Sequence, residues 1–365
     1  MASAATAERQ SQDDAVRVMI VDDSAVIRGF VSQWIGAEAG FAVAGTAGNG
    51  QEALDLLDSL NPDVVILDLD MPVLDGLATL PRLLSRRPEL SVLVVSTLTL
   101  RNAEISLECL ARGAVDYIPK PETRRELAGS LAFRQELGFK LRGLAPRHRR
   151  IPPGSTHRER PAPPAALPPA LARPRAIGIG ASTGGPNALA RILLGLGPVS
   201  RRLPILVVQH MPELFTRVFA EQLRTKTGLH VAEAEDGERL RPGRVYLAPG
   251  ARHMGLSDGA EVPPAIRLHD SAPVHHCRPA VDLLFADLAR VFGSATLGLV
   301  LTGMGSDGTE GARAIVRAGG AIFVQDETSS TVWGMPGSIA KAGLARRILP
   351  LGELATAVTE AVGLA

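Results

Sequence analysis

Three residues that could act as nucleophile, base and acid each come just after an apolar, β-branched run. Ser182 lies within GIGASTGGP, His210 follows PILVVQ, and Asp307 lies within LTGMGSDG. If these runs are parallel strands, their carboxyl ends meet at one sheet edge, which is where open α/β sheets bind ligands. A serine, a histidine and an aspartate at that edge predict acyl transfer through an activated hydroxyl.

The segment around Ser182 reads GASTG over residues 180–184 and fits the G-x-S-x-G pattern. That pattern predicts a strained turn from strand to helix that lifts the serine above the sheet. A helix is expected to begin near Pro186, and backbone N–H groups there could receive an oxyanion. A dinucleotide-binding loop is a poor match, because Thr183 stands where that motif needs its third glycine and no fitting acid follows.

The order Ser182, His210, Asp307 differs from the serine–acid–histidine order of the α/β-hydrolases. Asp326 is the competing acid, because it also follows a strand-like run, IFVQ. We favour Asp307, because its glycine-rich loop can bring the backbone close to the site. Asp282 lies on a helical pattern and is expected on a solvated face.

Two further loops carry His253 and the adjacent pair His275–His276, and both loops are expected to line the rim or contact the substrate. Cys277 follows directly, but adjacent residues cannot easily converge on one ion, so a zinc site is a poor match. The second cysteine, Cys109, is distant and no CxxC occurs, so the chain is expected in a reducing compartment.

A second group of polar residues also follows strand-like runs, nearer the N-terminus: Asp22, Asp23, Asp68, Ser96 and Lys120. Three carboxylates at one sheet edge repel each other and need a cation, and oxygen ligands that leave room for water and phosphate suit Mg²⁺. A lysine and a hydroxyl nearby would stabilise added phosphoryl oxygens. The predicted chemistry is attack of an aspartate on phosphorus to give an acyl phosphate. Helix capping by Asp23 would not explain five such residues.

The elements that position these residues alternate between buried strands and amphipathic helices, which predicts parallel sheets covered on both faces. The strand-like runs lie at residues 16–21, 64–67, 92–95 and 115–118, and then at 176–180, 204–208, 244–248, 296–301 and 320–324. Residues 145–175 are rich in proline and arginine and predict a semi-extended linker. The expected organisation is a tail over 1–15, a domain over 16–140, a linker over 141–175 and a second domain over 176–365.

Composition places few other limits on function. The chain has 365 residues, of which 45% are hydrophobic and 21% charged, and a formal net charge of +1. This near-neutral charge does not indicate binding to nucleic acid, and no helix-turn-helix pattern with a basic face is present. No apolar stretch approaches the roughly 20 residues of a membrane span, and the N-terminus does not resemble a secretory signal. We therefore expect a cytoplasmic, monomeric protein that neither binds nucleic acid nor inserts into a membrane.

Residues 16 to about 140 resemble a response-regulator receiver domain, which implies a flavodoxin-like fold with a five-stranded parallel sheet. The resemblance rests on the acidic residues above and on DYIPKP. It implies Asp68 as phosphoacceptor, Mg²⁺ held by Asp22, Asp23 and Asp68, Ser96 as switch hydroxyl, Tyr117 as aromatic switch and Lys120 as the phosphate-contacting lysine. It also implies a cis peptide between Lys120 and Pro121.

Residues 176 to about 365 resemble the catalytic domain of the chemotaxis protein-glutamate methylesterase (CheB) family, on GIGASTGGP, VVQHM, YLAPGARHM, HHCRPAVDLLF, LTGMGSDG and VWGMPGS. A doubly wound, Rossmann-like hydrolase domain without a cofactor is implied, with Ser182, His210 and Asp307 as the triad. Thr183 and the backbone near Met304 would line the oxyanion site.

The family resemblance also implies a substrate and a means of control. The substrates would be glutamate γ-methyl esters and glutamine amides on the cytoplasmic helices of chemoreceptors. A chemotaxis histidine kinase would phosphorylate Asp68 and relieve inhibition by the receiver, so residues 176–365 alone should outpace the unphosphorylated chain. The alternative is a response regulator whose hydrolase-like output domain only binds a partner.

Overall fold

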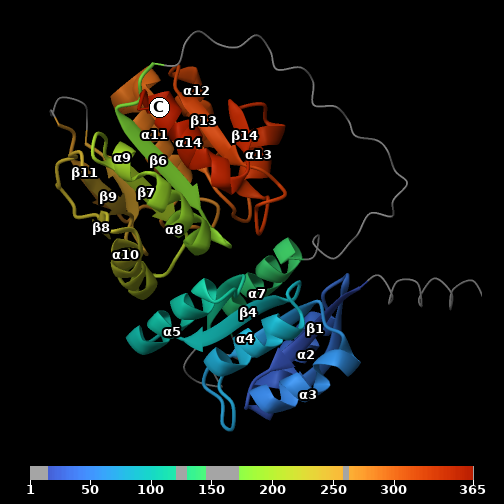
Figure 1. Ribbon diagram of the computed structural model, residues 1–365. Helices are drawn as coiled ribbons and strands as arrows, with labels where there is room; N and C mark the ends of the chain where they lie inside the picture. Colours follow the sequence, from blue (N-terminus) through green and yellow to red (C-terminus); the bar gives the residue numbers. More distant parts are fainter. Residues whose placement is uncertain (1–14, 121–129, 145–171, 258–262, 365) are drawn as a thin grey trace, which may run out of the picture. The chain divides into compact units, whose positions relative to one another are not determined.

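The computed structural model describes residues 15–120, 130–144, 172–257 and 263–364. The chain divides into two compact units, Met1–Thr156 and His157–Ala365 (Figure 1). Among the described residues, no helix is long and apolar enough to cross a membrane. The predicted tail at 1–15 and linker at 141–175 lie mostly outside these residues, as does Pro121, whose peptide bond was expected to be cis.

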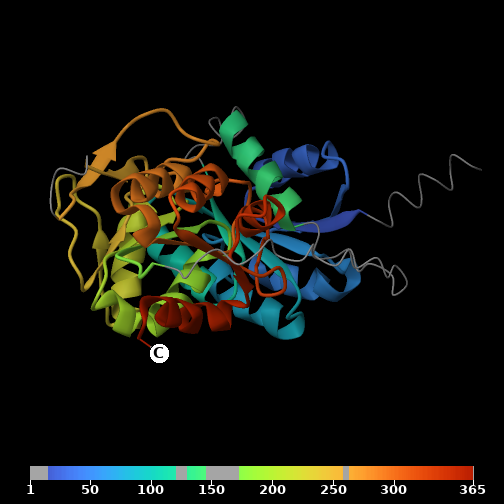
Figure 2. The same ribbon diagram turned by 90° about the horizontal axis from the view of Figure 1, so that it is seen from above.

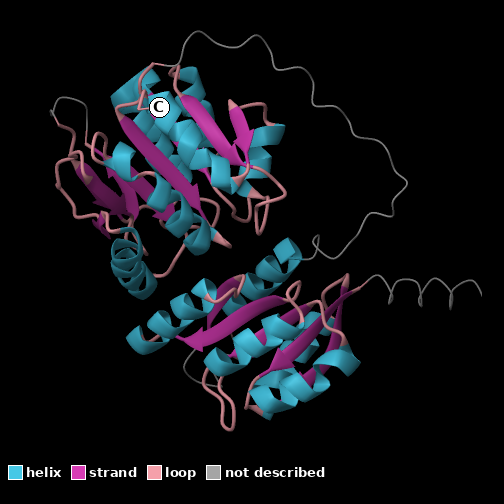
Figure 3. Ribbon diagram, in the orientation of Figure 1, coloured by secondary structure: helices cyan, strands magenta, loops and turns pink. Residues whose placement is uncertain are grey.

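The first unit is a parallel sheet in the order β2-β1-β3-β4-β5, which confirms the five-stranded sheet expected from the sequence. Its strands are β1 (Val16–Val21), β2 (Phe41–Ala47), β3 (Val64–Asp68), β4 (Ser91–Thr97) and β5 (Asp116–Lys120). Its helices are α2 (Ala25–Gly36), α3 (Gly50–Leu60), α4 (Gly76–Arg86), α5 (Leu100–Ala111) and α7 (Leu131–Leu144). Residues 64–68 of the central strand are all buried, as an apolar run covered by helices on both faces requires (Figure 3).

Polar residues begin the helices of this unit. Ser24 caps α2, Asn49 caps α3, Asp75 caps α4 and Thr99 caps α5, each through a side-chain oxygen that accepts a backbone N–H. The cap of α2 is therefore Ser24, and the preceding Asp23 is left exposed at the sheet edge. Capping thus fixes where each strand-to-helix loop ends, close to the carboxyl edge of the sheet.

Helix α7 runs to Leu144, four residues beyond the expected end of the first domain at residue 140. Its Phe133 ring lies 6.1 Å from the Trp34 ring of α2. Its buried apolar positions recur at helical spacing: Phe133, Leu137, Leu141 and Leu144. The helix is therefore an integral layer of the first unit.

The second unit is a seven-stranded parallel sheet in the order β14-β13-β12-β6-β7-β9-β8, so the doubly wound arrangement is confirmed. Its strands are β6 (Ala176–Ala181), β7 (Ile205–Gln209), β8 (His230–Glu233), β9 (Arg244–Leu247), β12 (Thr296–Val300), β13 (Ala321–Gln325) and β14 (Arg347–Leu349). The short strands β10 (His253–Leu256) and β11 (Ile266–His269) form a separate antiparallel hairpin (Figure 2).

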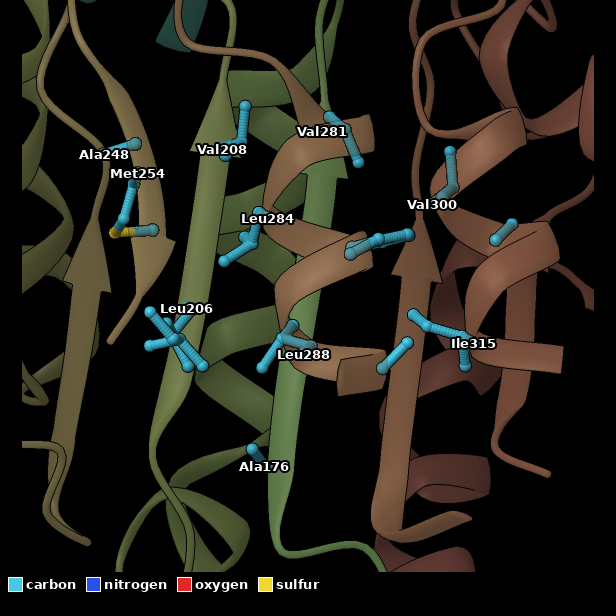
Figure 4. Close-up of a cluster of buried hydrophobic side chains, with 14 of the residues drawn as sticks. Ala176, Leu206, Val208, Ala248, Met254, Val281, Leu284, Leu288, Val300 and Ile315 are labelled. Carbon is cyan, nitrogen blue, oxygen red and sulfur yellow. The ribbon is translucent and has the colours of Figure 1, made fainter. Parts of the chain in front are cut away.

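Helices cover both faces of this second sheet. They are α8 (Gly185–Gly195), α9 (Gly197–Ser200), α10 (Glu213–Thr227), α11 (Val281–Phe292), the 3₁₀ turn η2 (Gly293–Ala295), α12 (Thr309–Arg317), α13 (Met335–Lys341) and α14 (Leu351–Val362). Helix α11 inserts Leu284, Leu288 and its neighbours into a buried cluster with Leu206, Val300 and Met254 (Figure 4). Through this cluster, α11 packs against both the hairpin and the central strands. The N-terminus of α11 faces the carboxyl edge of the sheet.

Candidate active site and phosphorylation site

The catalytic candidates lie at the topological switch point of the second sheet. From β6 the chain winds one way through β7 and later returns through β12 on the other side. Ser182 follows β6, His210 follows β7, and Asp307 lies in the loop after β12. Ala181 and Gln209 are partners in the ladder between β6 and β7, so Ser182 and His210 are the next pair along it. A switch point is where such sheets bind ligands.

The backbone at Ser182 is held from both sides. Its N–H donates to Thr302 O at 3.1 Å, and its carbonyl accepts from Gly185 N at 2.7 Å and Gln209 Nε2 at 2.9 Å. The expected strain at the serine is absent, since the left-handed residue of this turn is Gly184, with φ of 74°. Glycine takes that conformation without steric cost, so the turn into α8 needs no strain at Ser182 itself.

The loop after β12 approaches Ser182 closely through Gly303. A Cβ added at Gly303 would lie 2.9 Å from Ser182 Cβ and would also meet the sulfur of Met335. The next residue, Met304, is 8% exposed, and Thr183 on the other side of the site is 3% exposed. The two oxyanion candidates therefore belong to backbone segments that flank the serine.

His210 and Asp307 are joined directly, with Nε2 2.8 Å from Oδ2. Asp307 also accepts the backbone N–H groups of Val281 at 2.7 Å and Asp282 at 3.0 Å, at the N-terminus of α11. Burial alone would raise the pKa of Asp307, but the hydrogen bonds from His210 and these amides hold it below its usual value. Asp307 is thus a buried, ionised acceptor that orients the imidazole.

The other imidazole nitrogen of His210, Nδ1, lies 3.5 Å from the sulfur of Cys277. Burial alone would lower the pKa of His210, but Asp307 and Cys277 together raise it above its usual value. Within the described parts of the chain, no hydrogen bond joins the Ser182 hydroxyl to His210. From the sequence, a zinc site with Cys277 was a poor match and its loop was expected to line the rim or contact the substrate; the contact of Cys277 with His210 was not predicted.

Two sequence expectations about other acids and histidines differ from the structure. Asp282 was expected on a solvated face but is 7% exposed, because it accepts Gly311 N at 2.8 Å and pairs with His275 at 3.2 Å. His253 was expected near the rim but is fully buried, with Nδ1 accepting from Ala280 N at 3.2 Å.

The remaining sequence candidates of this unit lie on the surface or in a local turn. The competing acid, Asp326, accepts from the backbone and hydroxyl of Ser329 and closes that turn. His275 and His276 are exposed, as expected for rim residues. Asp307 is therefore the acid that the structure brings to His210.

The carboxyl edge of the first sheet brings together the predicted acidic residues. One oxygen from each of Asp22, Asp23 and Asp68 lies within 4.8 Å of the others. Lys120 Nζ lies 2.7 Å from Asp68 Oδ2 and 3.4 Å from Asp22 Oδ2. Burial raises the pKa of Asp68 to about 6 despite the opposing attraction of Lys120, and burial also raises that of Asp22. The excess of buried negative charge and the all-oxygen donor set fit a divalent cation.

The two predicted switch residues are both buried. Ser96 Oγ is 2.8 Å from Ser106 Oγ of α5, so the two hydroxyls form a hydrogen bond. Tyr117 is 3% exposed, and Lys140 Nζ lies 5.2 Å from the centre of its ring. Lys140 also donates to Tyr117 O and pairs with Asp116 at 3.0 Å. Sequence reasoning missed Lys140, since a single lysine in an amphipathic helix carries no signal of burial.

The fold and the two sites define a class: a receiver-type unit followed by a unit with a hydrolase-type centre. Comparison with known proteins agrees with this class. Residues 18–132 match the family model of the response regulator receiver domain, and residues 177–358 match that of the CheB methylesterase.

Similar proteins cover almost the whole chain. A protein-glutamate methylesterase/protein-glutamine glutaminase of group 2 operon from Bradyrhizobium diazoefficiens is 46% identical, over 94% of this chain and 93% of the relative. A protein-glutamate methylesterase/protein-glutamine glutaminase from Rhodopseudomonas palustris strain HaA2 is also 46% identical over the same shares, and one from Azospirillum brasilense is 43% identical over 93% and 91%. The chain belongs to the CheB methylesterase family and carries an N-terminal receiver domain.

Proposed function

We propose that this protein hydrolyses glutamate γ-methyl esters on the cytoplasmic helices of chemoreceptors and deamidates receptor glutamines. The observation that carries the proposal is the His210–Asp307 pair, 2.8 Å apart, at the sheet edge where Ser182 also lies. The printed names of the relatives, methylesterase and glutaminase, agree with this chemistry. Both reactions replace a leaving group on a side-chain acyl carbon, so one site can perform both.

In the proposed mechanism, His210 takes the proton of Ser182 as the hydroxyl attacks the ester carbonyl. Methanol leaves with that proton, and water then hydrolyses the glutamyl–serine ester with His210 again acting as base. Asp307 fixes the imidazole tautomer and stabilises the imidazolium form. Backbone N–H groups near Thr183 and Met304 would stabilise the oxyanion. Quenched turnover followed by mass analysis should find a glutamyl adduct on the Ser182 peptide of wild type and none in Ser182→Ala.

We further propose Asp68 as the residue that accepts a phosphoryl group from a chemotaxis histidine kinase. Asp22, Asp23 and Asp68 would hold Mg²⁺, which supplies charge neutralisation for the phosphoryl oxygens. Lys120 contacts the carboxylates of Asp22 and Asp68 and would bind an added phosphoryl oxygen. Ser96 and Tyr117 would respond to the phosphoryl group as the switch hydroxyl and the switch aromatic residue.

The regulatory proposal is a two-state contact between the units that phosphorylation weakens. Residues 176–365 alone should then release methanol faster than the unphosphorylated full chain. A small phosphodonor with Mg²⁺ should raise the rate of the full chain but not of Asp68→Asn. Equal rates for the fragment and the unphosphorylated chain would refute inhibition by the receiver.

We also propose that the protein acts as a monomer in the cytoplasm, where receptor helices and kinase would be accessible. Light scattering of the purified chain, with and without a phosphodonor, tests the oligomeric state. A mass of one chain supports the proposal, and a stable dimer contradicts it.

A further inference from the structure

Cys277 is placed over the active site by a tight turn. Val274 N donates to Cys277 O at 3.1 Å, and Cys277 N donates to Val274 O at 2.8 Å. The two residues between them, His275 and His276, have φ of 50° and 64°, a left-handed conformation that only a minority of non-glycine residues adopt. His275 pairs with Asp282 at the start of α11, which fixes the turn against the helix.

The turn brings the Cys277 sulfur to the one imidazole nitrogen that catalysis requires. Because Asp307 accepts from Nε2 of His210, the neutral ring carries its hydrogen on Nε2 and offers a single lone pair on Nδ1. The proposed mechanism needs that lone pair to accept the Ser182 proton. In the structure, the sulfur lies 3.5 Å from Nδ1 and no hydrogen bond joins the Ser182 hydroxyl to the described imidazole.

We propose that Cys277 is a positioning residue that occupies Nδ1 of His210 and holds the esterase site in a resting arrangement. This inference rests on the proposed role of His210 as the base for Ser182. The Ser182 hydroxyl and the Cys277 thiol compete for Nδ1 of His210. The hydrogen bond from Ser182 to His210 therefore forms only when the sulfur moves away from Nδ1.

The competition holds in both protonation states of the pair. When sulfur carries the proton, the thiol donates to the Nδ1 lone pair. When that proton moves from sulfur to Nδ1, the products are a thiolate and an imidazolium, and the ring cannot accept a second proton. In the second state the negative sulfur adds to the rise in the pKa of His210.

Four other titratable side chains lie near the His210–Cys277 pair. Asp307 bonds to His210 directly, Asp282 lies beside Asp307 on α11, His275 pairs with Asp282, and His253 of β10 is buried behind the site. All four of these groups are retained in the Cys277 variants, so we assign a shift in their pH dependence to the loss of the sulfur.

The test compares the full chain with Cys277→Ala and Cys277→Ser, measuring methanol release from methylated receptor membranes as a function of pH. Only alanine frees Nδ1, so its kcat/KM on the pH plateau should rise about two- to tenfold, as expected for one lost hydrogen bond. Serine keeps a hydroxyl donor and should match the wild-type plateau. Both variants remove the sulfur that contributes to the raised pKa of His210, so the acid limb should move to lower pH in both.

The controls separate this inference from the proposed mechanism. Cys109→Ala removes the other, buried thiol of the chain and should leave methanol release unchanged. The role of Cys277 would be overturned if the kcat/KM plateau of Cys277→Ala equals or falls below that of wild type. It would also be overturned if the acid limb of the pH profile is unmoved in both Cys277 variants. Hydrolysis that survives in Ser182→Ala would instead refute the triad. If Ser182→Ala is inactive while both Cys277 variants keep the wild-type pH profile, the triad stands and only the role of Cys277 is refuted.

Discussion

Asp68 should destabilise the domain that contains it when no cation is bound. Its side chain is 1% exposed, and burial raises its pKa from 3.8 to about 6 even though Lys120 lies 2.7 Å away. Because the folded-state pKa is above the unfolded-state value, ionisation of Asp68 at pH 7 lowers the free energy of unfolding by about 3 kcal/mol. Asp68→Asn keeps the shape and removes the charge, so it should stabilise the domain by about that amount.

Urea unfolding of residues 1–144 in a chelating buffer measures this difference, followed by the fluorescence of Trp34, the only tryptophan of this segment. The sign of the pH dependence follows from the raised pKa. The difference in the free energy of unfolding between Asp68→Asn and wild type should reach its full value above about pH 6. It should vanish below pH 3.8, where Asp68 is protonated in both the folded and the unfolded state. Added Mg²⁺ should narrow the gap, because it binds the folded wild type.

A matched control is Asp55→Asn, which removes an exposed carboxylate from α3 and should change stability by less than about 0.5 kcal/mol. The reasoning fails if Asp68→Asn is no more stable than wild type at pH 7. A gap that grows toward acid pH would refute it as well, since it would mean that the Asp68 pKa is lowered by its contacts.

Three further substitutions test the catalytic unit. Asp307→Asn should lower kcat/KM for methanol release about 10³–10⁴-fold, because the amide no longer fixes the tautomer of His210; activity near wild type would remove Asp307 from the triad. Gly303→Ala should lower kcat on the order of 10²-fold with a smaller effect on KM, because the new Cβ displaces the loop beside Ser182; unchanged kcat would contradict the close approach. Phe285 is fully buried on α11, so Phe285→Ala should lower the free energy of unfolding of residues 157–365 in urea by about 3–5 kcal/mol. A loss below about 1 kcal/mol would contradict the packing.

The elements that the sequence could predict are those buried on both faces. Continuous apolar runs such as residues 64–67 and 204–208 are strands, because a central parallel strand has no solvent-facing side. The positions of the edge strands β2, β8 and β14 were not located from the sequence, since their residues are mostly half-buried or exposed. The hairpin of β10 and β11 was missed for a similar reason, because four-residue strands leave little periodicity.

Positions at strand ends were predictable, whereas contacts between distant loops were not. Ser182, His210 and Asp307 could be placed at one edge because parallel strands share a direction. The contact of Cys277 with His210 joins segments 67 residues apart and depends on the turn at His275. The burial of Asp282 has the same origin, since its helical pattern does not show that the first turn of α12, 29 residues later, donates a backbone N–H to it.

The most direct test of the central claim is methanol release from methylated receptor membranes by wild type and Ser182→Ala, each with and without a small phosphodonor and Mg²⁺. The proposed mechanism predicts methanol from wild type only, at a rate that the phosphodonor increases. Equal release by Ser182→Ala would contradict the assignment of the nucleophile. Release by wild type that the phosphodonor leaves unchanged would contradict control of the esterase site by Asp68.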